Sequence, residues 1–591
     1  MLRSSIAAIA AAASCLTAAL PVGAQIADFK PVTAQTLTNP DPADWLMINR
    51  TYDEQRYSPL KEIDRANVGQ LRMEFVRGLP AGTNETTPIV YRGVMFMAAP
   101  GGNVMALNAI TGDTIWTYNR VYPREMTDFI GSAAAARTKN IAIFEDMIYF
   151  MTHDGFIVAL DAATGKVRWE TKTQDYKDQT QHTGGVIVAE GKVITNRTCE
   201  TRAGCFIAAH DAKTGKEVWK FYTTPAKGEP NGETWGNVDD EKRIASSWGL
   251  PGSYDPARKT VYWAIANPKP YTRLLRHGNP EGAGRSAPSD LYSNSTVALD
   301  IDTGKLAWHY QHLPGDDWDA DHIHERTLVR TKFEPDLKSV KWVNPKIPRG
   351  QERDMVISVG EAGGIWALDR QTGQFLWANP FPYDTPDSHI SKIDPDTGKV
   401  HINWDKVFKK DGDRSLVCYH NTRSWWSTAY HPGLNSLYIP FHDQCLDMTA
   451  NTKNPQGWGP RTSAMRPGTD KAKFSNIAKI NLSTGRMEVI HSQPEPGNGS
   501  ALVTGGNLLF WGDMNRRLRA FDAATGKVLW QTIVGGIVQT STITYAIAGR
   551  QYVAVLTGDG QSGTAGPIGV TKMPTVRGHN AVYVFALPAK K

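Results

Sequence analysis

The chain has 591 residues, of which 41% are hydrophobic and 21% are charged. This composition is too apolar for a disordered chain, and the length is sufficient to bury a large core. The 65 Lys and Arg residues and the 59 Asp and Glu residues give a formal net charge of +6. The basic residues form no run of the kind that nucleic-acid-binding proteins carry, so we expect no nucleic-acid partner.

The first 24 residues have the pattern of a secretory signal peptide. Arg3 supplies a positive charge, Ile6 to Leu20 form an apolar segment, and Val22 to Ala24 form a small-residue cleavage site. The segment is too short for a membrane span, and no other stretch contains the roughly 18 uninterrupted apolar residues that a span requires. Cys15 makes a lipoprotein signal the alternative. We expect an exported, periplasmic protein without a membrane span.

An eleven-residue phrase of the form AxDxxTGxxxW recurs along the chain. Its copies begin at residues 106, 159, 209, 298, 367, 479 and 520, and the copy at 479 lacks the closing Trp. Each copy follows a β-branched apolar run, which is typical of a strand, a turn and a second strand. The Asp or Asn can accept backbone N–H bonds in the turn, and the Gly tolerates positive φ. The Trp can pack against the neighbouring sheet.

A repeated β unit of this length predicts a ring of sheets. Seven copies and a terminal strand at residues 580–587 suggest seven or eight blades, and radial closure of the ring leaves only short sheet edges. We predict an all-β, eight-bladed β-propeller with tryptophan-docking repeats, built as one domain from residues 25–591. Because the repeats build the scaffold, function must come from segments that break the pattern.

Four cysteines follow the signal sequence, and their even number favours disulfides in an oxidising compartment. Pairing Cys199 with Cys205 and Cys418 with Cys445 is the most economical of three possibilities. A metal site is the alternative, but the chain has no CxxC motif and no paired His spacing. It also has no CxxCH motif, so we expect no covalently attached c-type haem on this chain. The first disulfide would hold Glu200 rigidly, as a hard cation requires of a carboxylate ligand.

Residues 246–271, SSWGLPGSYDPARKTVYWAIANPKPY, form a second segment outside the repeat. Trp248 lies outside the repeated phrase, so sheet docking does not account for it. Asn267 precedes a proline at the end of a β-branched run, and its side-chain oxygen can bind a metal ion. A simple strand-ending Asx turn explains Asn267 equally well.

The loop PGDDWDADHIHER, residues 314–326, contains four closely spaced aspartates. They are Asp316, Asp317, Asp319 and Asp321. Crowded carboxylates cost energy unless a cation, a proton or solvent neutralises them. The loop therefore predicts a metal ligand or a general base, and a solvated acidic loop is the alternative.

The segment NTRSWWSTAY, residues 421–430, places Arg423 beside two tryptophans, Trp425 and Trp426. Stacking and positive charge together suit a planar anionic ligand. Ordinary core packing with a surface cation is the alternative.

The repeated phrase, the PGDxWD loop and the stretch YWAIANPKPY together resemble the quinoprotein alcohol dehydrogenases. These are periplasmic enzymes that use pyrroloquinoline quinone (PQQ) and a bound metal ion, on an eight-bladed propeller with PQQ on its axis. The resemblance extends from Trp45 to Gly558. It implies oxidation of a small-molecule alcohol by hydride transfer to C5 of PQQ. It implies Ca²⁺ as the metal, with a lanthanide as the alternative, and a soluble cytochrome c or another separate electron acceptor.

The resemblance also implies roles for individual residues. Asp319 would be the catalytic base and, with Glu200, Asn267 and Asp321, a metal ligand. Asp321 stands where lanthanide-using relatives place an extra carboxylate, although calcium-using relatives can also have an acid there. Trp248 would form the floor under the quinone, and the residues expected to bind the cofactor are Glu85, Arg137, Thr183, Ser246, Trp248, Arg423 and Trp425.

One departure from the family bears on the substrate. Ala133 and Ala134 stand where many members have two adjacent cysteines as a roof over the quinone. The smaller side chains suggest room for a bulky or secondary alcohol, such as the C3 hydroxyl of the mycotoxin deoxynivalenol. The alternatives are a sugar or polyvinyl alcohol dehydrogenase and a non-catalytic propeller scaffold of outer-membrane assembly. A scaffold would not account for Glu200, Asn267 and Asp319 occurring together.

Overall fold

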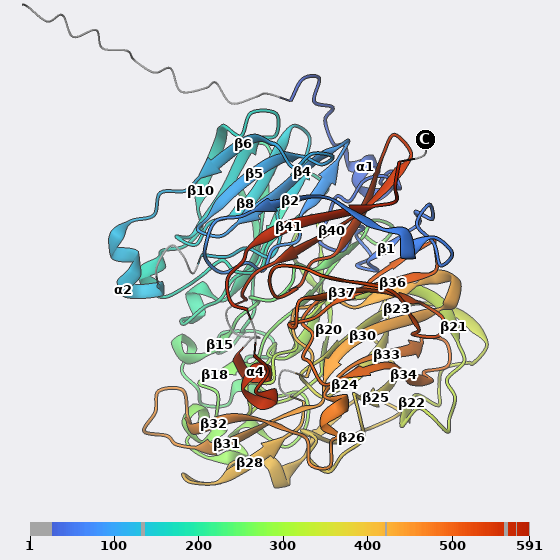
Figure 1. Cartoon of the computed structure of the whole chain (residues 1–591). Helices are drawn as coiled ribbons and strands as arrows, with labels where there is room; N and C mark the ends of the chain where they lie inside the picture. The colour runs from blue at the N-terminus through green and yellow to red at the C-terminus, as the bar shows by residue number, and fades with distance from the viewer. Residues whose placement is uncertain (1–25, 132–135, 420–421, 561–564, 575, 590–591) are drawn as a thin grey trace, which may run out of the picture.

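The computed structural model describes residues 26–131, 136–419, 422–560, 565–574 and 576–589. The described residues form eight sheets of four or more strands, and their α-helices are short. The helices are α1 (Ala34–Thr38), α2 (Thr127–Ile130), α3 (Arg273–His277) and α4 (Ala565–Thr571). This confirms the all-β fold class (Figure 1). The expected signal peptide, residues 1–24, lies outside the described residues.

Four antiparallel sheets follow one another in the first part of the chain, and each has four strands. The first two contain β3 (Ile89–Tyr91), β4 (Val94–Ala99), β5 (Asn103–Asn108) and β6 (Thr114–Asn119), then β7 (Ala142–Phe144), β8 (Met147–Met151), β9 (Phe156–Asp161) and β10 (Val167–Lys172). The next two contain β11 (Val186–Ala189), β12 (Lys192–Thr195), β13 (Phe206–Asp211) and β14 (Glu217–Tyr222), then β16 (Ser253–Asp255), β17 (Thr260–Ala264), β19 (Ser295–Asp300) and β20 (Leu306–Gln311).

Of the remaining four large sheets, the last two combine strands from both ends of the chain. The fifth contains β21 (Thr327–Phe333), β23 (Gln351–Gly360), β24 (Gly364–Asp369), β25 (Phe375–Pro380) and β22 (Trp342–Val343), and the sixth contains β29 (Ala429–His431), β30 (Ser436–His442), β33 (Ser475–Asn481) and β34 (Met487–Gln493). The seventh contains β1 (Tyr57–Ser58), β35 (Leu502–Thr504), β36 (Leu508–Gly512), β37 (Arg517–Asp522) and β38 (Val528–Ile533), and the eighth contains β2 (Arg72–Gly78), β41 (Ala581–Ala586), β40 (Arg550–Thr557) and β39 (Ile543–Ile547).

Each repeated phrase forms the turn between two adjacent antiparallel strands of a sheet. Between β9 and β10, one Asp161 carboxylate oxygen accepts hydrogen bonds from the backbone N–H and the hydroxyl of Thr164, both at 2.8 Å. Gly165 then adopts a φ of +70° and donates its N–H to the Asp161 carbonyl at 2.8 Å. The same arrangement recurs at Asp211, Asp300 and Asp369. The structure thus confirms the turn predicted from the sequence.

The Trp that ends each of the first four phrases packs against the turn of the next sheet. Trp116 donates its indole N–H to the carbonyl of Ala162, at 3.0 Å. Its ring lies directly under Gly165, where an added Cβ would be 2.5 Å from the indole. Trp169, Trp219 and Trp308 repeat both contacts with the sheets that follow them. The conserved spacing of Trp and Gly within the phrase therefore joins neighbouring sheets.

The chain of contacts passes through all eight sheets and returns to the first. Side chains of the fifth and sixth sheets share one apolar cluster, and the Tyr438 hydroxyl of the sixth donates to the Ala523 carbonyl of the seventh. The rings of Trp530 and Phe585 join the seventh sheet to the eighth. The Tyr545 hydroxyl then donates to the Ala109 carbonyl beside the first sheet, at 2.6 Å. Figure 1 shows β2 (blue) beside β41 and β40 (red), where the two ends of the chain form one sheet.

Replacing Gly165 by alanine should destabilise the protein by about 2–5 kcal/mol. A positive φ costs a non-glycine residue about 1–2 kcal/mol, and forcing a methyl group against the Trp116 indole adds about 1–3 kcal/mol. Urea unfolding would measure the loss. Gly191 is the matched control, because its φ is +68° and an added Cβ there would meet no atom within 4 Å. Equal losses for Gly165→Ala and Gly191→Ala would show that Trp docking contributes nothing.

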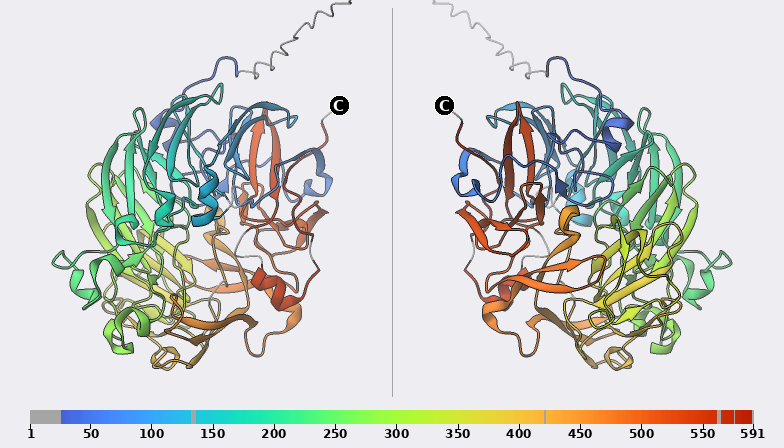
Figure 2. Two further views of the ribbon diagram at one scale, coloured as in Figure 1. Left: turned by 90° about the vertical axis from the view of Figure 1, so that its left-hand side faces the viewer. Right: turned by 90° about the vertical axis from the view of Figure 1, so that its right-hand side faces the viewer.

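Three small sheets lie outside the eight-sheet ring. They pair β15 (Ile244–Ala245) with β18 (Pro268–Lys269), β26 (Ile390–Ile393) with β27 (Val400–Ile402), and β31 (Gln444–Ala450) with β28 (Arg414–Val417) and β32 (Trp458–Met465). The third of these, β28–β31–β32, is called the cap sheet below. Helix α4 packs against β32 of the cap sheet (Figure 2). No helix among the described residues is long and apolar enough to span a membrane.

Candidate active site

A polar cavity of about 270 Å³ brings together segments that are far apart in the sequence. Its lining residues are Arg137, Gln179, Gln181, Thr183, Thr198, Glu200, Ser246, Trp248, Asn267, Lys269, Tyr271, Asp319 and Asp321. This set includes every residue predicted to bind the metal ion and four of those predicted to bind the cofactor. Glu85, Arg423 and Trp425 do not line the cavity.

The short ladder between β15 and β18 sets the position of one wall. Ile244 pairs with Lys269, and Ala245 pairs with Pro268. Ser246 and Trp248 follow the first of these strands, and Asn267 directly precedes the second. The ladder therefore fixes the position of the Trp248 indole relative to the Asn267 amide at the cavity.

Two of the four carboxylates of the aspartate-rich loop hold the loop in place, and the other two line the cavity. Asp316 accepts backbone N–H bonds from Trp318 at 2.6 Å and from Ala320 at 2.8 Å, so it shapes the loop. Asp317 accepts N–H bonds from Arg273 and Phe408, which anchor the loop to neighbouring segments. The side chains of Asp316 and Asp317 are buried rather than solvated.

Asp319 and Asp321 from the same loop line the cavity and are linked to Asn267. The Asn267 side-chain amide donates to Asp319 at 3.2 Å, and the Asn267 backbone N–H donates to Asp321 at 3.2 Å. The Trp248 indole N–H donates to the other Asp321 oxygen, also at 3.2 Å. Desolvation, together with the nearby charge of Asp319, raises the pKa of Asp321 well above its usual value.

Two cationic side chains contact the carboxylates at this end of the cavity. The Arg461 guanidinium of the cap sheet lies 2.8 Å from Asp319, and the Lys269 ammonium lies 2.6 Å from Glu200. Tyr271 stacks on Trp458 with ring centroids 4.1 Å apart, and Arg461 lies over the Trp458 ring. Because Arg461 packs on this aromatic stack, its guanidinium extends from the cap sheet to Asp319.

The oxygen ligands at the end of the cavity formed by Glu200, Asn267, Asp319 and Asp321 suit a hard cation. Carboxylate and amide oxygens are the ligands that Ca²⁺ prefers, and the two adjacent carboxylates Asp319 and Asp321 would be relieved of mutual repulsion by a cation. Within the described part of the chain, no three His, Cys, Asp or Glu side chains already converge on one point as metal ligands. Ligation by Glu200 therefore requires its carboxylate to turn from Lys269.

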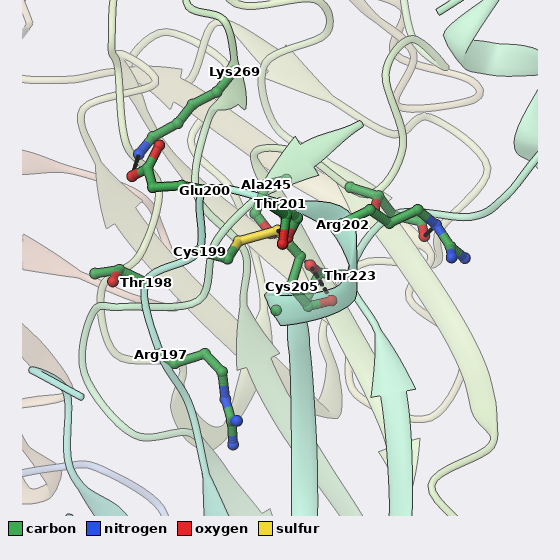
Figure 3. The surroundings of a disulfide bond; sticks show 12 residues. Arg197, Thr198, Cys199, Glu200, Thr201, Arg202, Cys205, Thr223, Ala245 and Lys269 are labelled. Atoms are coloured by element: carbon green, nitrogen blue, oxygen red, sulfur yellow. Dashed lines mark hydrogen bonds and ion pairs between the residues drawn. A yellow bond between two sulfur atoms is a disulfide. The ribbon is translucent and has the colours of Figure 1, made fainter. Parts of the chain in front are cut away.

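The disulfide that carries Glu200 is present as predicted. Cys199 and Cys205 are bonded and fully buried, and Glu200 extends from the loop that they close (Figure 3). Cys418 and Cys445 form the second predicted disulfide. It joins β31 of the cap sheet to the residue that follows β28.

The remaining predicted cofactor residues lie behind the cavity wall. Glu85 is buried and lies 3.4 Å from Arg137 and 3.5 Å from Lys139. Lys139 donates to the Thr183 carbonyl and lies 5.0 Å from the Trp248 ring and 5.4 Å from the Trp425 ring. Burial lowers the pKa of Lys139 to about 8. Trp425 packs edge-on against Trp248, so it supports the indole that faces the cavity.

Arg423 is held by a buried carboxylate rather than exposed to the cavity. Its guanidinium forms an ion pair with Glu325, and both side chains are almost fully buried. Glu325 also accepts hydrogen bonds from the backbone and hydroxyl of Thr428. Ala133 and Ala134, where we expected the smaller roof, lie outside the described residues.

Sequence reasoning assigned no role to Lys269, Tyr271 or Arg461. Lys269 could have been found, because residues two apart in an extended segment point to the same side, as Asn267 and Lys269 do. Arg461 carries no local signal, since it reaches Asp319 only through the packing of the cap sheet.

The fold and the cavity define a β-propeller with a polar, acid-lined site at which a cofactor and a metal ion can bind. Residues 45–166, 181–379 and 471–553 match the family model "PQQ: Glucose/ethanol/alcohol dehydrogenase, beta-propeller domain". These ranges cover more than half of the chain, which therefore belongs to this family of PQQ-dependent oxidoreductases. The match supports an enzyme rather than a scaffold.

Individual relatives agree with this assignment. The chain is 30% identical to the quinohemoprotein alcohol dehydrogenase ADH-IIG of Pseudomonas putida, over 88% of this chain and 73% of the relative. It is also 30% identical to the dehydrogenase subunit of the alcohol dehydrogenase (quinone) of Acetobacter aceti, over 100% of this chain and 82% of the relative. Among solved structures, a europium-containing methanol dehydrogenase superposes with a TM-score of 0.77 and 26% identity, covering 94% of this chain and 100% of that one.

Proposed function

We propose that this protein is a periplasmic PQQ- and Ca²⁺-dependent alcohol dehydrogenase that oxidises a bulky or secondary alcohol to a ketone or aldehyde. One observation carries the proposal: Glu200, Asn267, Asp319 and Asp321 line a single cavity with the indole of Trp248. Bound PQQ would supply the two-electron acceptor, and the metal ion would supply a Lewis acid.

Each chain residue has a distinct part in this proposal. Asp319 takes the proton of the alcohol hydroxyl, and the Arg461 guanidinium 2.8 Å away holds its carboxylate in position. Trp248 supplies a flat surface that fixes the plane of an aromatic cofactor, and Trp425 supports it from behind. Arg137 and Thr183 line the cavity and Lys139 donates to the Thr183 carbonyl behind it, so these cations and donors would hold the carboxylates of PQQ.

The compartment and the acceptor belong to the same proposal. The N-terminal leader pattern and the two disulfides support export to an oxidising compartment, with residues 25–591 as the mature domain. The chain has no CxxCH motif, so we propose that the electrons pass to a separate cytochrome c or a similar acceptor.

Reconstitution tests the proposed function. The mature protein should reduce an artificial electron-acceptor dye only when PQQ, Ca²⁺ and an alcohol are all present, and omission of PQQ or of Ca²⁺ is the control. The substrates should include ethanol, bulky secondary alcohols, deoxynivalenol, aldoses and polyvinyl alcohol. Protein that binds PQQ but oxidises none of them would refute dehydrogenase activity.

The same panel tests the substrate class. Turnover of methanol and ethanol at the rate of large secondary alcohols would contradict the bulky-alcohol proposal alone. A preference for aldoses or for polyvinyl alcohol would reassign the substrate within the family. Ferricytochrome c in place of the dye tests the acceptor.

A further inference from the structure

Lys269 stands in the metal-binding end of the cavity because of the local strand geometry. Asn267 and Lys269 are two residues apart at an extended segment, so their side chains point to the same side, and both line the cavity. The pairing of β18 with β15 fixes this segment, with Lys269 opposite Ile244. The ladder therefore fixes the backbone from which the lysine reaches the predicted metal-binding end of the cavity.

The ammonium of Lys269 forms an ion pair with the Glu200 carboxylate, which would also be a ligand of the metal ion. Its Nζ lies 2.6 Å from one Glu200 oxygen, and Figure 3 shows the Glu200 side chain directed at Lys269. The buried disulfide fixes the backbone of Glu200, while its side chain remains 40% exposed. A fixed backbone and an accessible carboxylate allow the Glu200 oxygens to turn between two cations without any change in the fold.

The charges at this end limit how strongly a cation is held. Three carboxylates, from Glu200, Asp319 and Asp321, face two protein cations, Lys269 and Arg461. The protein's own cations thus neutralise most of the negative charge that would attract a metal ion. The repulsion between a fixed ammonium and a metal ion grows in proportion to the charge of the ion.

We propose that Lys269 competes with the metal ion for Glu200 and that its fixed positive charge favours divalent over trivalent ions. This inference rests on the proposed function, because it assumes that the metal ion binds at Glu200, Asn267, Asp319 and Asp321. Lys269 then acts as a specificity-determining residue for the metal.

Metal binding to Lys269→Met tests the inference without any measurement of turnover. The mature protein would be dialysed to equilibrium against Ca²⁺ or La³⁺ at saturating PQQ, and the bound metal counted by mass spectrometry. The substitution keeps the length of the side chain and removes its charge. We expect the Kd for Ca²⁺ to fall about tenfold, and the Kd for La³⁺ to fall further, because the trivalent ion is repelled more strongly by the lysine. Lys269→Arg should retain the wild-type values.

Arg202→Gln is the matched control for this experiment. Arg202 lies in the same disulfide loop, pairs with Glu229 at 3.1 Å and does not line the cavity. Figure 3 shows it on the other side of the disulfide from Lys269. Removing its charge should leave both Kd values within about twofold of wild type, because the Arg202 guanidinium is already paired with Glu229 and lies outside the cavity.

The outcomes separate this inference from the proposed function. If Glu200→Gln does not weaken metal binding in wild-type protein, the proposed metal site is wrong and the inference fails with it. If Glu200 is required but Lys269→Met leaves the Kd unchanged or raises it, the metal site stands and competition by Lys269 is refuted. If Lys269→Met lowers the Kd for Ca²⁺ and for La³⁺ by the same factor, Lys269 does not favour divalent over trivalent ions.

Discussion

Asp319→Asn is expected to lower kcat by about 10²–10⁴-fold while PQQ and metal remain bound. The amide keeps an oxygen that can face a metal ion, but it cannot accept the proton of the alcohol. The hydrogen bond from Asn267 and the ion pair with Arg461 show that the Asp319 carboxylate is fixed beside the predicted metal ligands. Dye-reduction kinetics would measure the loss, and PQQ absorbance with metal analysis would confirm that the site is still loaded.

The control for this substitution is Asp384→Asn. Asp384 is exposed, pairs with Lys341 and does not line the cavity, so kcat should remain at the wild-type value. A fully loaded Asp319→Asn enzyme with unchanged kcat would exclude Asp319 as the base. Loss of PQQ or metal from the variant would instead show that the carboxylate is needed for binding.

Arg423→Met is expected to lower the free energy of unfolding by about 3–5 kcal/mol. The substitution leaves Glu325 buried without its cation, although the hydrogen bonds from Thr428 remain. Urea unfolding of the cofactor-free protein would measure the loss. Removing the buried charge as well, in Arg423→Met/Glu325→Gln, should recover part of it.

Arg414→Met is the matched control, and PQQ affinity is the second measurement. Arg414 pairs with Asp447 on the surface of the cap sheet with 73% of its side chain exposed, so its loss should cost at most about 1 kcal/mol. The sequence predicted that Arg423 binds the cofactor. An Arg423→Met protein of wild-type stability with weakened PQQ binding would support that prediction over a structural role.

The repeated phrase made most of the fold predictable. Its Asp, Thr, Gly and Trp each have a local reason, and the structure shows the turn hydrogen bonds and the Trp contacts in successive sheets. The copy at residue 479 lacks the Trp, and there the next contact is made by the hydroxyl of Tyr438. Tyr149 and Tyr262 make the same contact alongside a Trp, so it comes from a strand outside the phrase and could not be predicted from the phrase.

The site was predictable only where its residues belong to recognisable motifs. Asn267 and Asp319 lie in such motifs, and the structure brings them within hydrogen-bond distance. The cap sheet lies in residues 380–470, which the family model does not match. Arg461 reaches Asp319 through the stack of Tyr271 on Trp458, so its position depends on tertiary packing that no sequence pattern reports.

The eighth sheet has a consequence for how the molecule is made. It takes β2 from near the beginning of the chain and β39, β40 and β41 from the end. A nascent polypeptide cannot complete this sheet until its last strand has been synthesised, and pairing across so large a sequence separation is intrinsically slow. Truncation before β41 would leave unpaired edges on β2 and β40, which are sites for aggregation. A circular permutant that starts at β39 would carry all four strands of this sheet on neighbouring stretches once the old termini are linked.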